Sequence, residues 1–144
     1  KFVAVNTQLN STNLGFHVIS KYIGANCITI NETEMRHELR NKTAHTIPLI
    51  KTLSKKLKSK YTHVTSGESG SVIYNSTLKE IIGCPAFANK VIDKVGTGDT
   101  MLAILAISLF KKFNIKLSKL FKFVSNKLLF IIYRCKFINN IIII

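Results

Sequence analysis

Short apolar runs rich in β-branched residues alternate along this chain with segments of helical periodicity. FVAVN at Phe2–Asn6 and CITI at Cys27–Ile30 are apolar at most positions, as is typical of strands buried on both faces, and Tyr61–Thr65 is a third strand candidate. Helical patterns over Glu32–Arg40 and Ile47–Lys58 separate these runs. The alternation predicts an α/β fold, a three-layer sandwich with a mostly parallel sheet and helices on both faces.

Further elements are expected along the rest of the chain. Two short strands after the third one, Ser71–Tyr74 and Lys79–Ile82, are candidates for an antiparallel edge. The remaining candidates are a strand at Lys90–Ile92 and helices at Thr12–Tyr22, Gly98–Lys112 and Leu117–Tyr133. Because the chain starts directly on a strand-like run, we expect the fold to be incomplete at the N-terminus.

Two helices carry local signals that place their ends or their faces. Asn31 can cap the helix that begins at Glu32, with Glu34 as the capping-box partner. In the helix over Ile47–Lys58, we expect the apolar side chains to face the core and the lysines to face solvent. The residues expected to face the core are Ile47, Ile50, Leu53 and Leu57.

The charge of the chain is unevenly distributed. The net charge is +14, all seven acidic residues lie between Glu32 and Asp99, and eight Lys/Arg follow Met101 without an acid. A basic chain suits nucleic acid, anionic lipid or phosphorylated small molecules, and a lysine- and isoleucine-rich composition alone also explains it. No interleaving of aromatic and basic residues occurs in the first 100 residues, so we expect no nucleic-acid partner.

The cysteines and histidines do not form a recognisable metal motif. No CxxC or Cys/His spacing is present, and we expect reduced thiols in a cytoplasmic protein. We expect the histidines to lie at the surface. The residues concerned are Cys27, Cys84, Cys135, His17, His37, His45 and His63.

A glycine loop precedes the helix expected at Gly98–Lys112. The backbone N–H groups of Gly96, Thr97 and Gly98 can point at an oxyanion, because glycines allow a close approach and a helix N-terminus carries partial positive charge. Asp99 follows in the first helical turn, where the helix dipole favours its charge and where a carboxylate could accept a proton from a substrate hydroxyl. From these residues alone, an ordinary loop followed by a helix cap remains an alternative.

Three motifs together resemble the ribokinase/PfkB carbohydrate kinase family. DKVGTGDTMLAI resembles that family's glycine-rich signature, ITINETE its N-x-x-E element, and VTSGESGSVIY its T-x-G-x-x-G strand–turn–strand. They occur in the family's order and cover about residues 1 to 110. The segments NTQLNSTNLGFHVISKY and CPAFANKVIDKVGTGD are more similar to the heptose-phosphate kinase-like sugar kinases of ADP-heptose synthesis.

The resemblance implies a role for each matched residue. Asp99 would be the catalytic base, with Gly96, Thr97 and Gly98 as the anion hole. Asn31 and Glu34 would organise Mg²⁺ through water. The residues that would line the nucleotide site are Thr65, Gly67, Gly70 and Asn126. Asp93 would shape the loop and contact a monovalent cation or a phosphate, and an acid that caps the loop is the alternative.

The resemblance also implies cofactors, partners and a division of the chain. It predicts an ATP-dependent phosphotransferase with an alcohol group as acceptor. The cofactors would be ATP and Mg²⁺, and the acceptor a sugar or sugar phosphate. A homodimer is one of the oligomeric states that the resemblance allows. Residues 1–112 would form the ATP-binding and catalytic part. Residues 113–144 would form a basic apolar helix and an atypical tail.

Two departures from the family pattern keep other functions open. Lys94 stands where much of the family has threonine, and Lys127-Leu128-Leu129-Phe130 replaces small residues expected after Asn126. The alternatives are an inactive kinase fragment that at most binds nucleotide, and membrane-surface binding through the basic tail. No stretch of about 18 uncharged apolar residues is present, so we do not expect a membrane-spanning helix.

Overall fold

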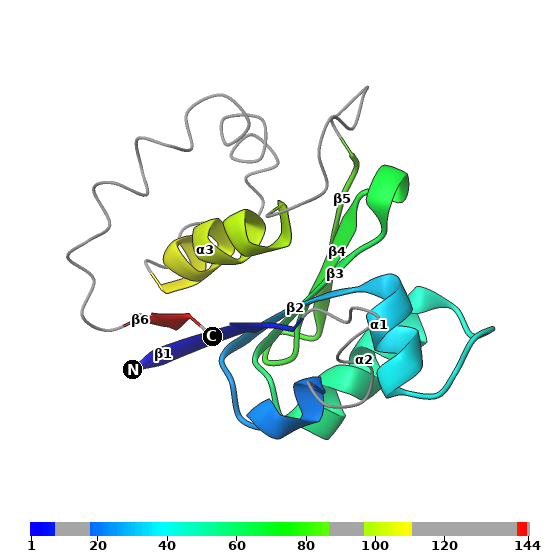
Figure 1. Cartoon of the computed structure of the whole chain (residues 1–144), viewed down its shortest axis with the longest axis horizontal. Helices are drawn as coiled ribbons and strands as arrows, with labels where there is room; N and C mark the ends of the chain where they lie inside the picture. The colour runs from blue at the N-terminus through cyan, green and yellow to red at the C-terminus, as the bar shows by residue number, and fades with distance from the viewer. Residues whose placement is uncertain (8–17, 87–96, 111–140, 144) are drawn as a thin grey trace.

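A six-stranded sheet with the strand order β5-β4-β3-β2-β1-β6 forms the centre of the computed structural model, which describes residues 1–7, 18–86, 97–110 and 141–143 (Figure 1). Strands β1, β2, β3 and β6 run parallel, whereas β3, β4 and β5 are joined in antiparallel order. The predicted mostly parallel sheet and its antiparallel edge are therefore confirmed. The strands are β1 Phe2–Asn6, β2 Cys27–Asn31, β3 Tyr61–Thr65, β4 Ser71–Asn75, β5 Glu80–Cys84 and β6 Ile141–Ile143.

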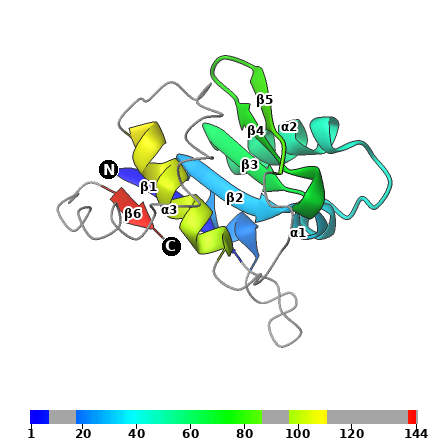
Figure 2. The same ribbon diagram turned by 90° about the horizontal axis from the view of Figure 1, so that it is seen from above.

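Helices cover both faces of the sheet and complete three layers. Helices α1 (Glu32–Glu38) and α2 (Thr46–Leu57) pack on one face, and α3 (Thr97–Phe110) packs on the other (Figures 1 and 2). Two short 3-10 turns, η1 (Ile19–Tyr22) and η2 (Gly67–Ser69), lie in the connections. The helix predicted at residues 12–22 is described only from residue 18, where η1 lies. The strand predicted at residues 90–92 and the helix predicted at residues 117–133 lie outside the described residues.

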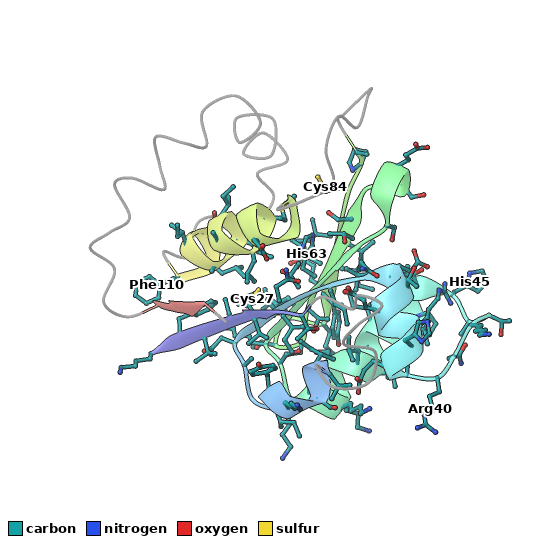
Figure 3. All side chains as sticks on the ribbon, viewed as in Figure 1. Cys27, Arg40, His45, His63, Cys84 and Phe110 are labelled. Carbon is teal, nitrogen blue, oxygen red and sulfur yellow. The ribbon has the colours of Figure 1, made fainter. Side chains whose placement is uncertain are left out.

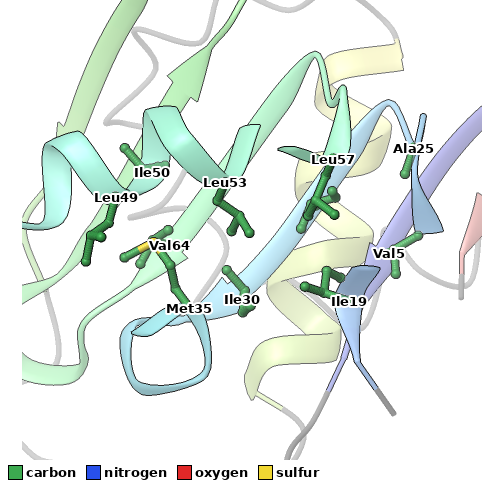
Figure 4. Close-up of a cluster of buried hydrophobic side chains, with 11 residues drawn as sticks. Val5, Ile19, Ala25, Ile30, Met35, Leu49, Ile50, Leu53, Leu57 and Val64 are labelled. Carbon is green, nitrogen blue, oxygen red and sulfur yellow. The ribbon is translucent and has the colours of Figure 1, made fainter. Parts of the chain in front are cut away.

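The larger core lies between the sheet and helices α1 and α2 (Figure 4). Met35 from α1 and Leu53 from α2 are completely buried, as are Ile28 of β2 and Val64 of β3. Each such side chain contributes about 1.5–3 kcal/mol relative to exposure. This packing fixes α1, and with it the residues at the end of β2 where α1 begins.

The face that α2 buries is rotated slightly from the predicted one. Ile50, Leu53 and Leu57 are buried as predicted, but Ile47 is 47% exposed, and Leu49 is buried instead. At about 100° per residue, Ile47 lies roughly a quarter of a turn from the centre of the buried stripe. The prediction for Ile47 was wrong because an apolar residue in the first turn can match a helical spacing without facing the core.

A second core lies under α3. Leu102, Leu105, Ala106 and Leu109 pack on Ala4, Cys27 and Ile73 of three strands. The rings of Phe2 and Phe110 meet edge-on at 6.2 Å between centroids, which joins the end of α3 to the start of β1. Helix α3 is therefore held along its length against β1. Within the described ranges, no helix has the length and apolar character needed to cross a membrane.

Candidate active site

Polar residues end all three of the central parallel strands at one edge of the sheet. Asn6 ends β1, Asn31 ends β2 and Thr65 ends β3, and Asn31 pairs with Thr65 in the sheet register. Helix α3 starts at the same edge, because Asp99 in its first turn contacts Asn6. The carboxyl ends of parallel strands are where ligands bind in open α/β sheets. This edge is therefore the candidate site.

Asp99 presents an accessible carboxylate at this edge. Its side chain is exposed, and its Oδ1 accepts a hydrogen bond from Nδ2 of Asn6 at 2.9 Å, across 93 positions of sequence. Asp99 takes part in neither the Arg36–Glu32 nor the Lys56–Glu38 ion pair. The start of a helix favours a negative charge at this place. The carboxylate is thus held by a neutral donor and stays open to solvent.

The predicted glycine loop is described only in part. Thr97 and Gly98 are the first two residues of α3, so their backbone N–H groups belong to the helix N-terminus, which is rich in unpaired donors. Gly96, Asp93 and Asn126 lie outside the described residues. Their predicted roles stay predictions.

Asn31 and Glu34 form the predicted capping box at the start of α1. Oδ1 of Asn31 accepts from the backbone N–H of Glu34 at 2.8 Å, and Oε2 of Glu34 accepts from the backbone N–H of Asn31 at 3.0 Å. Glu34 is 7% exposed, whereas Asn31 is exposed. The structural role of this pair is confirmed. Its position at the end of β2 also places both side chains at the candidate site.

Glu32 is a residue of this edge that sequence reasoning did not single out. Its Oε1 accepts from Nη2 of Arg36 at 2.6 Å and from Oγ1 of Thr46 at 2.8 Å. Hydrogen bonds from Ser66, and then from Arg36 and Thr46, lower the pKa of Glu32 to about 2. This carboxylate therefore joins α1 and α2 to the turn after β3. The acid–arginine spacing of four residues is the sequence signal that could have found it.

The turn after β3 contains both glycines of the predicted nucleotide site. Gly67 has φ +55° and Gly70 has φ +87°, both in the left-handed region. Ser66 donates its backbone N–H to the oxygen of Gly70 at 2.8 Å, which closes the turn. A Cβ at Gly70 would lie 2.1 Å from the backbone oxygen of Cys84, so no side chain fits there. The backbone geometry thus requires Gly70, whether or not it also contacts a nucleotide.

His63 contradicts the expectation that the histidines lie at the surface. His37 and His45 are exposed and His17 lies outside the described residues, but His63 in β3 is completely buried on the α3 side of the sheet (Figure 3). Its Nδ1 lies 3.4 Å from Oγ1 of Thr29, and Nε2 has no hydrogen-bond partner in the described part of the chain. Burial lowers the pKa of His63 to about 4. The expectation failed because β3 lies inside the sheet, between β2 and β4, where polar positions are enclosed as well as apolar ones.

The comparisons with known proteins agree with the fold and with the motifs. The model of the pfkB family carbohydrate kinases matches residues 3–126. The chain belongs to this family. Within the pfkB family, it is 37% identical over 102 residues to the bifunctional protein HldE of Helicobacter pylori (strain ATCC 700392 / 26695), and 37% identical over 100 residues to HldE of Campylobacter curvus (strain 525.92). Each match covers 67% of this chain and 21% of the relative.

Solved structures place this pfkB-family chain in the ribokinase-like fold. Ribokinase from Giardia lamblia matches with a TM-score of 0.60 at 17% identity, covering 84% of this chain and 38% of that protein. Arabidopsis thaliana ribokinase, solved with ribose and ATP, matches with a TM-score of 0.54 at 23% identity, covering 65% and 31%. The predicted family and fold are confirmed. The chain spans about a fifth of the length of the curated relatives it matches.

Proposed function

We propose that residues 1–112 form the ATP-binding and catalytic part of a carbohydrate kinase, which transfers the γ-phosphoryl group of ATP to a sugar hydroxyl. One observation carries the proposal. An exposed carboxylate, Asp99, lies in the first turn of α3 at the carboxyl edge of the parallel strands, held by Asn6 and by no cation among the described residues. Family membership supports the same reaction class.

The proposed chemistry divides between the carboxylate and the backbone. Asp99 accepts the proton of the sugar hydroxyl as its oxygen forms a bond to the γ-phosphorus. The bond between that phosphorus and the bridging oxygen of the leaving ADP breaks at the same time, so the charge remains balanced. Backbone N–H groups of Gly96, Thr97 and Gly98 stabilise the negative charge on the transferring phosphoryl oxygens.

The remaining site residues are assigned to the nucleotide and its metal ion. Asn31 and Glu34 would hold Mg²⁺ through water. The capping box fixes the orientation of both side chains, because each accepts a backbone hydrogen bond. When bound, Mg²⁺ neutralises phosphate charge. Asp93 would shape the loop and contact a monovalent cation. The nucleotide-lining residues would be Thr65, Gly67, Gly70 and Asn126.

A sugar phosphate is the acceptor that we favour. The similarity to HldE supports the heptose-phosphate kinase-like branch that the sequence resemblance predicts. The net charge of +14 also favours an anionic acceptor over a neutral sugar, because it raises the local concentration of anions.

Turnover by the chain with ATP, Mg²⁺ and a panel of sugars and sugar phosphates tests the proposal. The isosteric variant Asp99→Asn should lower kcat by roughly 10²–10⁴-fold. Glu80→Gln is the matched control and should keep kcat, because Glu80 starts β5 at the opposite edge of the sheet. Calorimetry with ATP separates the alternatives. Binding without turnover indicates a chain that only binds nucleotide, and absence of binding contradicts the proposal.

A further inference from the structure

We propose that Asn6 is the positioning residue for Asp99, fixing one carboxylate oxygen so that the other faces the substrate hydroxyl. This inference rests on the proposed function, in which Asp99 is the base. Asn6 opens the segment NTQLNSTNLGFHVISKY, but the family resemblance assigns it no role, and only the folded structure brings it to Asp99. The contact joins the last residue of β1 to the first turn of α3.

The chemistry of the two groups determines which atoms meet. An ionised carboxylate only accepts hydrogen bonds, so the NH₂ group of Asn6, and not its carbonyl oxygen, must face Asp99. At 2.9 Å, the donor engages Oδ1, and no hydrogen bond from the described part of the chain engages Oδ2. A neutral amide orients the carboxylate through a hydrogen bond that is weaker than the charge-assisted bond of an arginine or lysine.

Both partners stand on packed elements, so the contact has a defined geometry. Strand β1 pairs with β2 on one side and β6 on the other, and Ala4 and Val5 just before Asn6 are completely buried. Helix α3 rests on the same strand through Leu102 and Leu105. A functional group held by rigid elements keeps its productive orientation better than one on a free loop.

The alternative is that Asn6 only stabilises the head of α3. A double-mutant cycle with Asn6→Ala and Asp99→Ala, followed by urea denaturation, first tests whether the contact exists in solution. We expect a coupling of roughly two- to tenfold in the unfolding equilibrium constant. Asn26→Ala is the control, because Asn26 accepts from the backbone of Val3 at the other end of β1. It should show no coupling to Asp99, and absence of coupling for Asn6 would overturn the proposal.

The variant Asn6→Asp tests whether Asn6 acts as a hydrogen-bond donor to Asp99 or only fills space. It keeps the size of the side chain but places two carboxylates against each other. The loss of stability relative to the wild-type chain should be largest at pH 7 and should shrink towards pH 4, as the pair takes up a shared proton. A loss that does not change with pH would show that Asn6 acts only through packing.

Measurements of turnover then distinguish a positioning role of Asn6 from a purely structural one. Asn6→Ala should lower kcat by roughly 10- to 100-fold with little change in the KM for ATP, whereas Asn26→Ala should keep kcat. If the wild-type chain turns over and Asn6→Ala keeps its kcat, positioning is refuted while the kinase proposal stands. If the wild-type chain does not turn over, the kinase activity is refuted for this chain, and the coupling and pH measurements still decide whether Asn6 fixes Asp99.

Discussion

Replacing Gly70 by alanine tests how the turn after β3 is built. Gly70 has φ +87°, and a Cβ there would lie 2.1 Å from the backbone oxygen of Cys84 and 2.8 Å from the backbone nitrogen of Ala86. Gly24 offers a matched control because it has the same φ of +87° but no atom within 4 Å of its Cβ position. Both substitutions place a side chain at positive φ, and only the one at Gly70 adds a clash with neighbouring backbone atoms.

The two substitutions should differ by the cost of the clash. A left-handed conformation costs an L-residue about 1–2 kcal/mol, so Gly24→Ala should lower the free energy of unfolding by that amount. Gly70→Ala adds overpacking against backbone, which is worth about 1–3 kcal/mol more, for a total of about 2–5 kcal/mol. The backbone at the end of β5 cannot turn away as a flexible side chain would.

Urea denaturation followed by far-UV circular dichroism measures both effects as shifts in the midpoint at an unchanged slope. Gly70→Ala should unfold at a clearly lower urea concentration than Gly24→Ala. Equal midpoints for the two variants would refute the steric reasoning. ATP calorimetry on the same Gly70→Ala protein at low temperature then shows whether the turn also supports the nucleotide.

Two further predictions concern buried ionisable groups. His63 has a folded pKa of about 4 against an ordinary 6.5, so the unfolded chain takes up the proton first, and stability that is complete above pH 6.5 should fall as the pH drops to about 4. At about 1.4 kcal/mol per pH unit the loss is about 3 kcal/mol, and it should be absent in His63→Leu when urea midpoints are compared across this range. Burial raises the pKa of the Cys27 thiol to about 12, so with Cys84 and Cys135 replaced by serine, Cys27 should react with an aromatic disulfide reagent only as fast as the chain unfolds. Rapid labelling of the folded chain would contradict the packing of Cys27 under α3.

Local patterns in the sequence predicted the elements and the caps well. The strands β1 and β3 have the predicted bounds, and the capping box of Asn31 and Glu34 is present. These features depend on neighbouring residues, whose spacing is visible in the sequence. Ile47 and His63 were predicted wrongly because burial depends on what packs against an element, which the sequence of that element does not contain.

In the candidate site, too, features that depend on neighbouring residues were predicted and contacts between distant segments were not. The motifs identified Asp99, Thr65 and the glycines, since each lies in a short segment with its own pattern. The contact of Asp99 with Asn6 was not predicted, because the two residues lie 93 positions apart and meet only when α3 packs on β1. Likewise, the bond between Glu32 and Ser66 requires that β2 and β3 lie side by side. Contacts between distant segments therefore carry the information that the sequence alone did not supply.

The pairing of β6 with β1 has a consequence for how the chain reaches its native state. Phe2 lies opposite Ile141, so this pair closes a loop of almost the entire chain. The entropy lost in closing so long a loop means that the strand formed from the first residues must wait longest for its outer neighbour. Until Ile141–Ile143 have been synthesised, the edge of β1 that pairs with β6 lacks this partner, and an open strand edge invites pairing with other chains.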